Sequence, residues 1–431
     1  MGDGSNASNG SGGTIQKTTG NAISLTGITG AGVSLSSMII KTSTHGGISG
    51  TGVNNFALLG CQVLNNGTTL ADNGIHLFDV SGVATFTNDT VTGSFNNNVW
   101  LDTTVGSTAV MTSLTVTNGT YGSSANDDGF LVSLKNAAAV NTAAFTGATF
   151  TNNFAKGLQL QQNDNAVLGN GVGAPATGTV TVTGCTFTNN NVGASFEGGG
   201  GTNGTGSVYF RFVNNTNILG NQSEAVNFAN GSDSGGGTFK AFASGNVIGN
   251  AGVASSGSAF GNGMRFFMQG QQAATLTIVN NTIRQIPFGR GIDVEELGRP
   301  GPGHGQTRLD VKVTGNDVNP QDITGFPLYA IYVASDAQGT GTSGSNVIAE
   351  IHGNTVPSSP DACDTMCGPG TGMIFYETVA GATGTEVAAL FNAFGGATVN
   401  AEIANNNTGT AGKTVTQGTV TLTSTPPNTV N

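Results

Sequence analysis

The chain has 431 residues, of which 70 are glycine, more than twice the usual share of about 7%. Only 9% of the residues are charged, whereas a soluble domain usually carries about 25%, yet 37% are hydrophobic. The formal net charge of −11 argues against the basic surface that binds nucleic acid or anionic lipid. No run of about 20 apolar residues indicates a membrane helix. This composition favours an all-β repeat protein.

Residues 1–13 read MGDGSNASNGSGG and predict a flexible leader. Met1-Gly2-Asp3 lacks the basic and apolar regions of a signal peptide, so we expect a fragment of a longer secreted chain. The repeats that follow predict one solenoid over 14–411. Residues 412–431 predict a final strand, which Pro426-Pro427 ends, and a tail.

Two short patterns alternate along the chain. The first is a small residue followed by alternating apolar positions, the period of a strand with one buried face. It is found in NAISL (21–25), NGIHLFD (73–79), NNVWLD (97–102), DGFLVS (128–133), KGLQLQ (156–161), GASFE (193–197), AVNFA (225–229), NGMRFF (262–267), RGIDVE (290–295), YAIYVA (329–334) and TGMIFY (371–376).

The second pattern is a strand that ends in a small or Asn pair and an apolar residue, as in VTGCTFTNN (182–190) and KVTGNDVNP (312–320). Aligned copies place one position in register. This column contains Met38, Cys61, Asp89, Leu114, Ala148, Cys185, Asn215, Asn246, Asn281, Asn316, Asn354 and Asn406.

A repeat with a minimum step of just over 20 residues suits one coil of three short strands, and such coils must stack to bury their apolar faces. We therefore predict a right-handed, single-stranded parallel β-helix of about twelve coils. Asn in one column predicts an internal ladder of amides that hydrogen-bond along the axis. Residues 385–394 predict a short helix near the last coils.

These repeats resemble the secreted bacterial parallel β-helix proteins, which include autotransporter-like passengers and Asn/Thr/Gly-rich adhesins. The resemblance covers about residues 14–425 and implies a secreted or cell-surface location. The same fold is found in pectate lyases, other polysaccharide lyases, hydrolases and phage tailspikes, so it does not assign a function.

Stacking the first strand of every coil predicts an outward ladder that mixes aromatic, amide and acidic side chains. Such a face suits sugars, although long loops often cover outward aromatic residues. The candidate ligand-binding residues are His76, Trp100, Gln159, Gln161, Glu197, Asn227, Tyr332 and Tyr376. Longer insertions in the C-terminal half favour a recognition surface there.

Arg265, Asp293 and Glu295 form the sharpest chemical cluster on this ladder. Asp293 and Glu295 share one strand face at about 6.6 Å, near the lower limit of the about 6.5–9.5 Å of an inverting glycosidase pair. The alternative is a structural ion pair between neighbouring coils, which mimics a perturbed catalytic group.

No cofactor is predicted, and no metal site. Calcium at Asp293 and Glu295 is conceivable, but the calcium-binding nonapeptide repeat is absent and the four histidines lack ligand spacing. Cys61 and Cys185 fall in the inward column. Cys363 and Cys367, in CDTMC, suit a local disulfide in an oxidising compartment.

The leading hypothesis is an extracellular β-helix, adhesin- or passenger-like, that binds a glycan or another cell-surface ligand along the solenoid face without spanning a membrane. The alternative is a polysaccharide lyase or glycoside hydrolase with Asp293 and Glu295 as acid and base and Arg265 as charge stabiliser. A second alternative is a structural subunit that stacks end to end, as opposed to a monomer.

Overall fold

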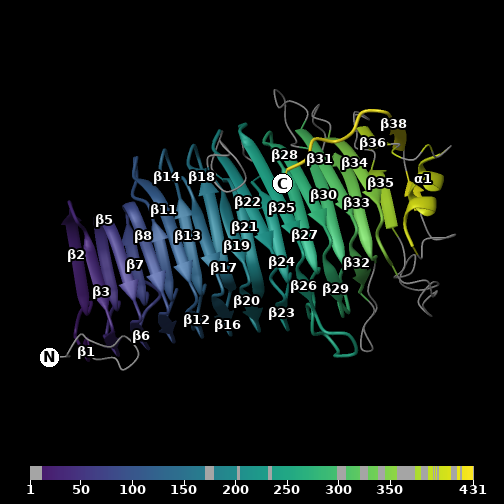
Figure 1. Cartoon of the computed structure of the whole chain (residues 1–431). Helices are drawn as coiled ribbons and strands as arrows, with labels where there is room; N and C mark the ends of the chain where they lie inside the picture. The colour runs from purple at the N-terminus through teal and green to yellow at the C-terminus, as the bar shows by residue number, and fades with distance from the viewer. Residues whose placement is uncertain are drawn as a thin grey trace. The chain divides into compact units, whose positions relative to one another are not determined.

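The computed structural model consists mainly of short parallel strands (Figure 1). It describes residues 12–169, 179–200, 204–231, 235–298, 307–320, 329–337, 345–356, 374–379, 387–391, 393, 395, 398–408, 415–417 and 420–430. The predicted Cys363–Cys367 disulfide lies outside these residues.

The chain divides into two compact units, which we describe separately. Unit 1 comprises Met1–Phe196 and Ser207–Phe210, and unit 2 comprises Glu197–Gly206 and Arg211–Asn431. The division falls within β21 (Val192–Gly200) and β22 (Ser207–Val213).

Unit 1 has three parallel sheets, which we call A, B and C. Sheet A contains β1 (Gly13–Gln16), β4 (Met38–Lys41), β6 (Gln62–Leu64), β9 (Thr90–Thr92), β12 (Thr120–Gly122), β16 (Thr149–Thr151) and β20 (Thr186–Thr188). Sheet B contains β2 (Ile23–Ile28), the first half of β5 (Ile48–Leu59), β7 (Ile75–Phe78), β10 (Val99–Asp102), β13 (Phe130–Leu134) and β17 (Lys156–Asn163). Sheet C contains β3 (Val33–Ser36), the second half of β5, β8 (Ser81–Thr87), β11 (Val110–Thr117), β14 (Ala139–Val140), β15 (Ala143–Thr146), β18 (Val167–Leu168) and β19 (Val180–Thr183).

Unit 2 has three sheets of the same kind, to which we give the same letters. Sheet A contains β23 (Asn217–Leu219), β26 (Val247–Ile248), β29 (Thr282–Arg284) and β32 (Asp317–Asn319). Sheet B contains β24 (Val226–Asn230), β27 (Met264–Gln269), β30 (Ile292–Gly298), β33 (Ile331–Ala337), β35 (Ile374–Val379) and β37 (Val415–Gln417). Sheet C contains β25 (Thr238–Ser244), β28 (Ala273–Val279), β31 (Thr307–Thr314), β34 (Ser345–His352), β36 (Val387–Phe391) and β38 (Val420–Thr423).

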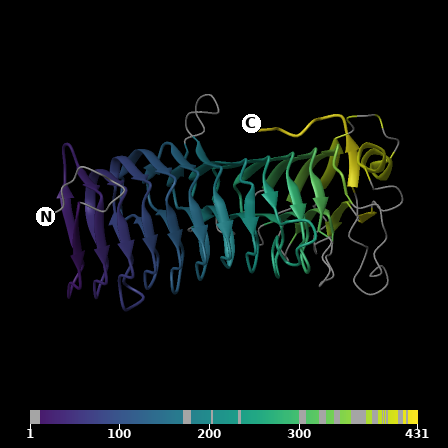
Figure 2. The ribbon, with the colours of Figure 1, turned by 60° about the horizontal axis from the view of Figure 1, so that its bottom comes forward.

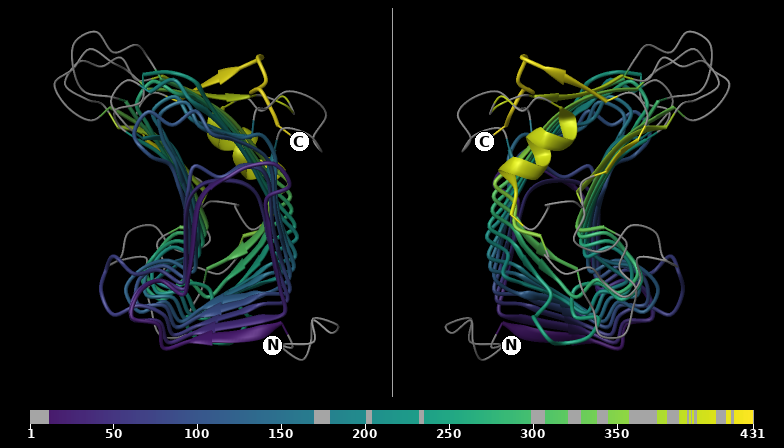
Figure 3. Two further views of the ribbon diagram at one scale, coloured as in Figure 1. Left: turned by 90° about the vertical axis from the view of Figure 1, so that its left-hand side faces the viewer. Right: turned by 90° about the vertical axis from the view of Figure 1, so that its right-hand side faces the viewer.

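The order of strands along the chain makes each unit a parallel β-helix, as the repeats predict. The chain passes from A to B to C and then returns to A one coil further on (Figures 2 and 3). Alternate residues point inward, so β22 alternates between half-buried and buried positions throughout its length. Each strand hydrogen-bonds to the equivalent strand of the next coil, which is why the apolar positions recur in register.

Aromatic residues stack in the interior of each unit. In unit 1 the rings of Phe150 and Phe187, on successive strands of sheet A, lie 5.1 Å apart and nearly parallel. In unit 2 the rings of Phe228 and Phe266 are stacked at 4.6 Å. Because equivalent positions recur in every coil, one aromatic residue packs on the next in the same column.

The predicted amide ladder is present in unit 2, at the corner between sheets C and A. Each side-chain oxygen accepts hydrogen bonds from the backbone and side-chain nitrogens of the preceding Asn, at 2.9–3.1 Å from Asn246 to Asn281. Each side-chain nitrogen also donates to a backbone carbonyl, as Asn281 does to Ala243 at 3.0 Å. The ladder contains Asn215, Asn246, Asn281, Asn316, Asn354 and Asn407.

Two predicted members of the column were wrong. Leu114 lies in β11 of sheet C, where it pairs with Ala84 and Ala143, and the corner position of that coil is Gly119. The last position is Asn407 rather than Asn406. The equivalent corner of unit 1 contains Cys61, Asp89, Gly119, Ala148 and Cys185 instead of amides.

Unit 1 has its amides at the corner between sheets A and B. Asn153 donates from its backbone and side-chain nitrogens to Asn190 at 3.1 and 2.9 Å, and its own side-chain oxygen accepts from Asn98 at 3.2 Å. Asn66 occupies a similar place, where it accepts from the Ser43 backbone at 3.0 Å. Both units thus satisfy buried backbone groups with amides, but at different corners.

The predicted helix at 385–394 is also wrong, because Val387–Phe391 forms β36, which pairs with β34 and β38. The helix is α1 (Val399–Asn406), whose first turn is capped by the Thr398 hydroxyl. The predicted final strand is two strands, β37 in sheet B and β38 in sheet C. The segment after β38 runs back across sheet C, where Asn428 donates to Asp310 at 2.7 Å (Figure 1).

Asp89 is a buried carboxyl group in the corner column of unit 1. One oxygen accepts a hydrogen bond from the Cys61 backbone at 2.8 Å, and the other has no partner among the described residues. Burial raises the pKa of Asp89 to about 7, although the backbone N–H groups of Cys61 and Thr87 lower it. The native chain therefore holds a proton on Asp89 that the unfolded chain loses near pH 4.

We expect Asp89→Asn to stabilise unit 1. In the unsubstituted chain the free energy of unfolding falls between about pH 4 and about pH 7, because in this range Asp89 ionises only in the unfolded state. The variant has no carboxyl group at this position and does not show this fall. The gain in free energy of unfolding should be about 2–4 kcal/mol at pH 8 and small at pH 4. Urea unfolding at both pH values measures it, and an unchanged difference would contradict a protonated Asp89.

Asp79→Asn is the matched control, because it should show the opposite pH dependence. Hydrogen bonds from Ser107 and Thr104 lower the pKa of Asp79, although burial raises it. A lowered pKa means that ionised Asp79 stabilises the native state at neutral pH. This stabilisation is lost as the pH falls through the native pKa of Asp79. The variant should therefore be less stable than the unsubstituted chain at pH 8, with a smaller difference at acid pH.

Candidate functional site

The outward face of sheet B in unit 2 brings together Arg265, Asp293 and Glu295. Arg265 lies opposite Asp293 in the pairing of β27 with β30, and Glu295 is two residues further along β30 on the same face. The Asp293 side chain is only 3% exposed, the Glu295 side chain 21% and the Arg265 side chain 31%. The cluster thus has a buried carboxylate beneath two more accessible charged groups.

Arg290 is the centre of this cluster, and the sequence analysis did not identify it. Its Nη1 donates to Asp293 Oδ1 and to Glu295 Oε1, both at 2.6 Å. Its guanidinium carbon lies 3.6 Å from the centre of the Tyr332 ring. Asn262 donates to the other Asp293 oxygen at 2.8 Å and accepts from the Arg290 backbone at 2.7 Å. Arg290 is therefore held by charge on one side and by an aromatic face on the other.

Burial raises the pKa of Asp293 to about 6. The Arg290 charge lowers this pKa, whereas the Glu295 carboxylate beside it raises it, and Arg265 lowers it. Burial lowers the pKa of Arg290, but the two carboxylates more than compensate and leave it above its ordinary value. Arg290 is therefore charged at neutral pH.

Arg265 has a different environment. Three carboxylates surround it, Glu224 and Asp293 at 4.0 Å and Glu295 at 3.9 Å, and its guanidinium carbon lies 4.2 Å from the Phe267 ring centre. None of these distances is a hydrogen bond, and no described residue accepts one from its side chain. Its N–H groups are therefore available to a ligand.

Two successive loops between sheets A and B carry the same motif, FGNGMR (260–265) and FGRGID (288–293). This repeat is the sequence signal that identifies Asn262 and Arg290 as equivalent positions. Glycine is required because a Cβ at Gly289 would overlap the carbonyl of Gly261, and one at Gly261 would overlap the backbone at Ser223 and Glu224. The loops therefore stack directly on each other.

The stacked loops place Phe260 and Phe288 side by side at the surface. Their rings are nearly parallel, with centres 6.0 Å apart, and the residues are 69% and 48% exposed. The pair is therefore an exposed aromatic surface and not part of the core. We call Phe260, Asn262, Arg265, Phe288, Arg290, Asp293 and Glu295 the sheet B cluster.

The separation of the carboxylates bears on the predicted acid/base pair. Asp293 Oδ1 and Glu295 Oε1 both lie 2.6 Å from the same nitrogen, so they cannot be more than twice that distance apart. This limit is below the about 6.5–9.5 Å of inverting glycosidases and close to the about 5–5.5 Å of retaining ones. Arg290 occupies the position between the two oxygens.

The other predicted ladder residues are distributed over both units, and several are covered. Gln159 and Tyr332 are buried, whereas Gln161, Glu197 and Asn227 are half-buried. In unit 1 the rings of His76 and Trp100 are stacked at 4.2 Å. Tyr376 pairs with Val333, whereas the repeat places it opposite Ala334. The alignment of the last copy, TGMIFY (371–376), was therefore wrong by one residue.

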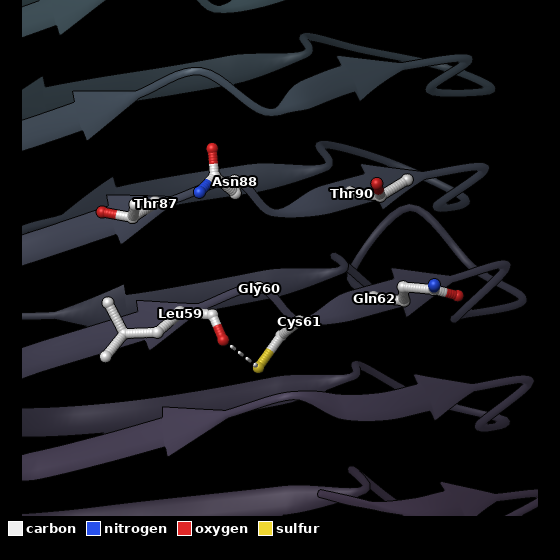
Figure 4. Close-up of a pocket in the computed structure, with 7 residues that line it drawn as sticks. All are labelled: Leu59, Gly60, Cys61, Gln62, Thr87, Asn88 and Thr90. Carbon is white, nitrogen blue, oxygen red and sulfur yellow. Dashed lines mark hydrogen bonds between the residues drawn. The ribbon is translucent and has the colours of Figure 1, made fainter. Parts of the chain in front are cut away.

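A shallow depression in unit 1 lies over the corner between sheets C and A. It has a volume of about 440 Å³ and is lined by Leu59, Gly60, Cys61, Gln62, Thr87, Asn88 and Thr90 (Figure 4). The Cys61 thiol points inward toward the Leu59 carbonyl, and burial raises its pKa. A buried, protonated thiol is inert, so this depression does not provide a reactive site.

The fold thus defines a parallel β-helix protein. Comparisons of the chain with protein-family models, with curated proteins and with solved structures found no match. The described residues include no group of three or more His, Cys, Asp or Glu side chains placed to hold a metal ion. Within the same residues no helix has the length and apolar character needed to cross a membrane.

We expect Arg290→Met to lower the free energy of unfolding by about 3–5 kcal/mol, because it leaves two carboxylates without their shared cation. Arg265→Met is the matched control and should cost less than about 1 kcal/mol, since that side chain is 31% exposed and no described residue accepts a direct hydrogen bond from it. Urea unfolding of both variants measures the difference. Equal losses would contradict the central position of Arg290.

Proposed function

We propose that this protein is an extracellular, carbohydrate-binding β-helix of the adhesin or passenger kind, which binds glycan at the sheet B cluster. The observation that carries the proposal is the exposed Phe260–Phe288 pair on the loops that lead into the strands of Arg265 and Asp293. Sugar rings present apolar C–H faces that pack on aromatic rings, and their hydroxyls hydrogen-bond to guanidinium, carboxylate and amide groups. The cluster offers both kinds of contact at adjacent positions.

The polar groups of the cluster fit hydroxyl recognition better than recognition of a simple ion. Two arginines are offset by Glu224, Asp293 and Glu295, so the site has no excess of positive charge for an anion. Glu295 is partly exposed and accepts a hydrogen bond from Arg290, while the N–H groups of Arg265 are able to donate to a ligand. A polyhydroxylated ligand needs both donors and acceptors.

A secreted or cell-surface location fits the chemistry of the buried cysteines. Cys61 and Cys185 are both buried, and burial raises the pKa of the Cys185 thiol to about 12. Such thiols resist oxidation in an oxidising compartment, because the thiolate is the reactive species. The low content of charged residues is consistent with a β-helix whose surface is mainly uncharged and polar.

Phe288→Ala and Arg265→Met should each weaken glycan binding about tenfold or more, because each removes one kind of contact from the centre of the site. Phe154→Ala, at a phenylalanine in unit 1 that is 67% exposed, should leave binding unchanged. A glycan array followed by calorimetry on the best oligosaccharide measures these effects. Binding that survives both substitutions would contradict the proposal.

A hydrolase is the second candidate, favoured by the raised pKa of the buried Asp293 beside Glu295. Arg290 between the two carboxylates opposes it, since a substrate would have to displace that side chain. Incubation with acidic and neutral polysaccharides separates the candidates. Product release that disappears in Asp293→Asn would establish the enzyme and replace the adhesin.

A further inference from the structure

Four successive coils of unit 1 present threonine outward from sheets C and A. In each coil a strand of sheet C ends in Thr-x-Thr or Ala-x-Thr, and after a two-residue corner a strand of sheet A follows with a similar segment, as in TFTNDTVT (85–92). The residues between the threonines, such as Phe86 and Val91, are buried, so the threonines point outward. Only Ala144 and Gly122 interrupt the pattern. We call the following set the threonine surface: Thr85, Thr87, Thr90, Thr92, Thr115, Thr117, Thr120, Thr146, Thr149, Thr151, Thr181, Thr183, Thr186 and Thr188.

The threonines form straight columns because their strands pair in register. In sheet A, whose strands β12, β16 and β20 follow one another in Figure 1, Thr120 pairs with Thr90 on one side and with Thr149 on the other. Successive coils lie about 4.8 Å apart, and the two columns of one sheet lie about 6.6 Å apart along the strand. Each sheet therefore carries a two-dimensional lattice of one side chain. The sheet C column nearest the corner contains Thr87, Thr117, Thr146 and Thr183.

The solenoid itself does not require threonine at these positions. Valine and isoleucine suit a strand as well as threonine does, because all three are branched at Cβ. The equivalent outward positions of sheet A in unit 2 contain other residues, such as Asn217 and Leu219 in β23, Arg284 in β29, and Asp317 and Asn319 in β32. Threonine in four successive coils is therefore a property of this surface and not a condition for stacking coils.

Each threonine presents a hydroxyl and a methyl group in a restricted direction. Branching at Cβ limits the rotation of the side chain, and neighbouring threonines on the sheet limit it further. The hydroxyls of Thr188 and Thr151, one coil apart, form a hydrogen bond of 2.9 Å. A hydroxyl both donates and accepts, as a water molecule does. The threonine surface thus repeats one polar and one apolar group at fixed intervals, and it contains no charged side chain.

We infer that the threonine surface binds ice. A two-dimensional lattice of side chains is complementary to a ligand that repeats in two directions, which is a crystal and not a dissolved molecule. Water oxygens in hexagonal ice repeat at intervals close to the coil spacing and to the spacing between columns, so the hydroxyls fit lattice positions while the methyl groups occupy the spaces between them.

Two other crystalline ligands fit the threonine surface less well. A crystalline polysaccharide packs its sugar faces on aromatic rings, and a mineral binds through charged groups, but this surface contains neither. The inference goes beyond the proposed function, because the sheet B cluster lies in unit 2.

The freezing behaviour of a single ice crystal in a solution of the full chain tests the inference. The protein should lower the freezing point below the melting point, by an amount that rises with its concentration. Thr149→Tyr in sheet A and Thr117→Tyr in sheet C each raise a ring above the lattice and should remove most of this difference. Loss in only one variant would assign the contact to that sheet. Thr51→Tyr, at an exposed outward position of sheet B in the same unit, is the matched control and should change nothing.

Equal freezing and melting points, together with exclusion of the fluorescently labelled protein from growing ice, would overturn the inference. Activity that survives both Thr149→Tyr and Thr117→Tyr in folded variants, as shown by unchanged melting temperatures, would also overturn it. Binding to microcrystalline cellulose or chitin that these substitutions remove, without any effect on ice, would assign the surface to a polysaccharide instead. Phe288→Ala should leave the ice assay unchanged, and Thr149→Tyr should leave the glycan assay unchanged, so either function can fail while the other stands.

Discussion

The buried corner is the constraint on which both units depend. Where the chain turns from one sheet to the next inside the solenoid, backbone N–H and C=O groups lose their strand partners yet remain out of water. An amide side chain satisfies both, because its oxygen accepts from one coil and its nitrogen donates to another. In unit 2 the ladder from Asn215 to Asn407 does this at every described coil, and in unit 1 Asn98, Asn153 and Asn190 do it at another corner.

The scarcity of charge follows from the same stacking. Any side chain in a sheet repeats at about 4.8 Å in the next coil, so a column of like charges would repel itself. Charges are tolerated where the next coil supplies the opposite sign, as for Arg265 and Asp293, or Lys312 and Glu350 at 2.9 Å. The sheet B cluster contains charges of both signs, and Arg265 makes no direct hydrogen bond to the carboxylates around it. The stacking of coils alone does not explain such a cluster.

The repeats predict the β-helix because period and burial are local properties of the sequence. Alternation within strands and a small or Asn residue at each corner recur in nearly every coil. Leu114 was misplaced because its strand, β11 (Val110–Thr117), continues past the residue that resembles a corner. The error at 385–394 has a similar origin, since a run of small apolar residues suits a helix and a buried strand equally well.

The candidate site was less predictable. The register of β27 and β30 follows from the repeat and brings Arg265 to Asp293. Arg290 lies in a loop, and its direction depends on the close approach of Gly289 to Gly261, which only the folded coils reveal. Burial of the ladder is likewise not a local property: Tyr332 points outward yet is covered, partly by Arg290 itself.

The sheet B cluster combines two loops that join sheet A to sheet B with the strands β27 and β30 that follow them. An interior strand of a sheet cannot change without disturbing the neighbouring coils, because it pairs on both edges. The loops lie outside the sheets, so their length and residues vary from coil to coil. Where two successive loops repeat one motif, as FGNGMR and FGRGID do, they acquire the register of the strands that follow. A β-helix can thus turn two variable loops into one ordered surface.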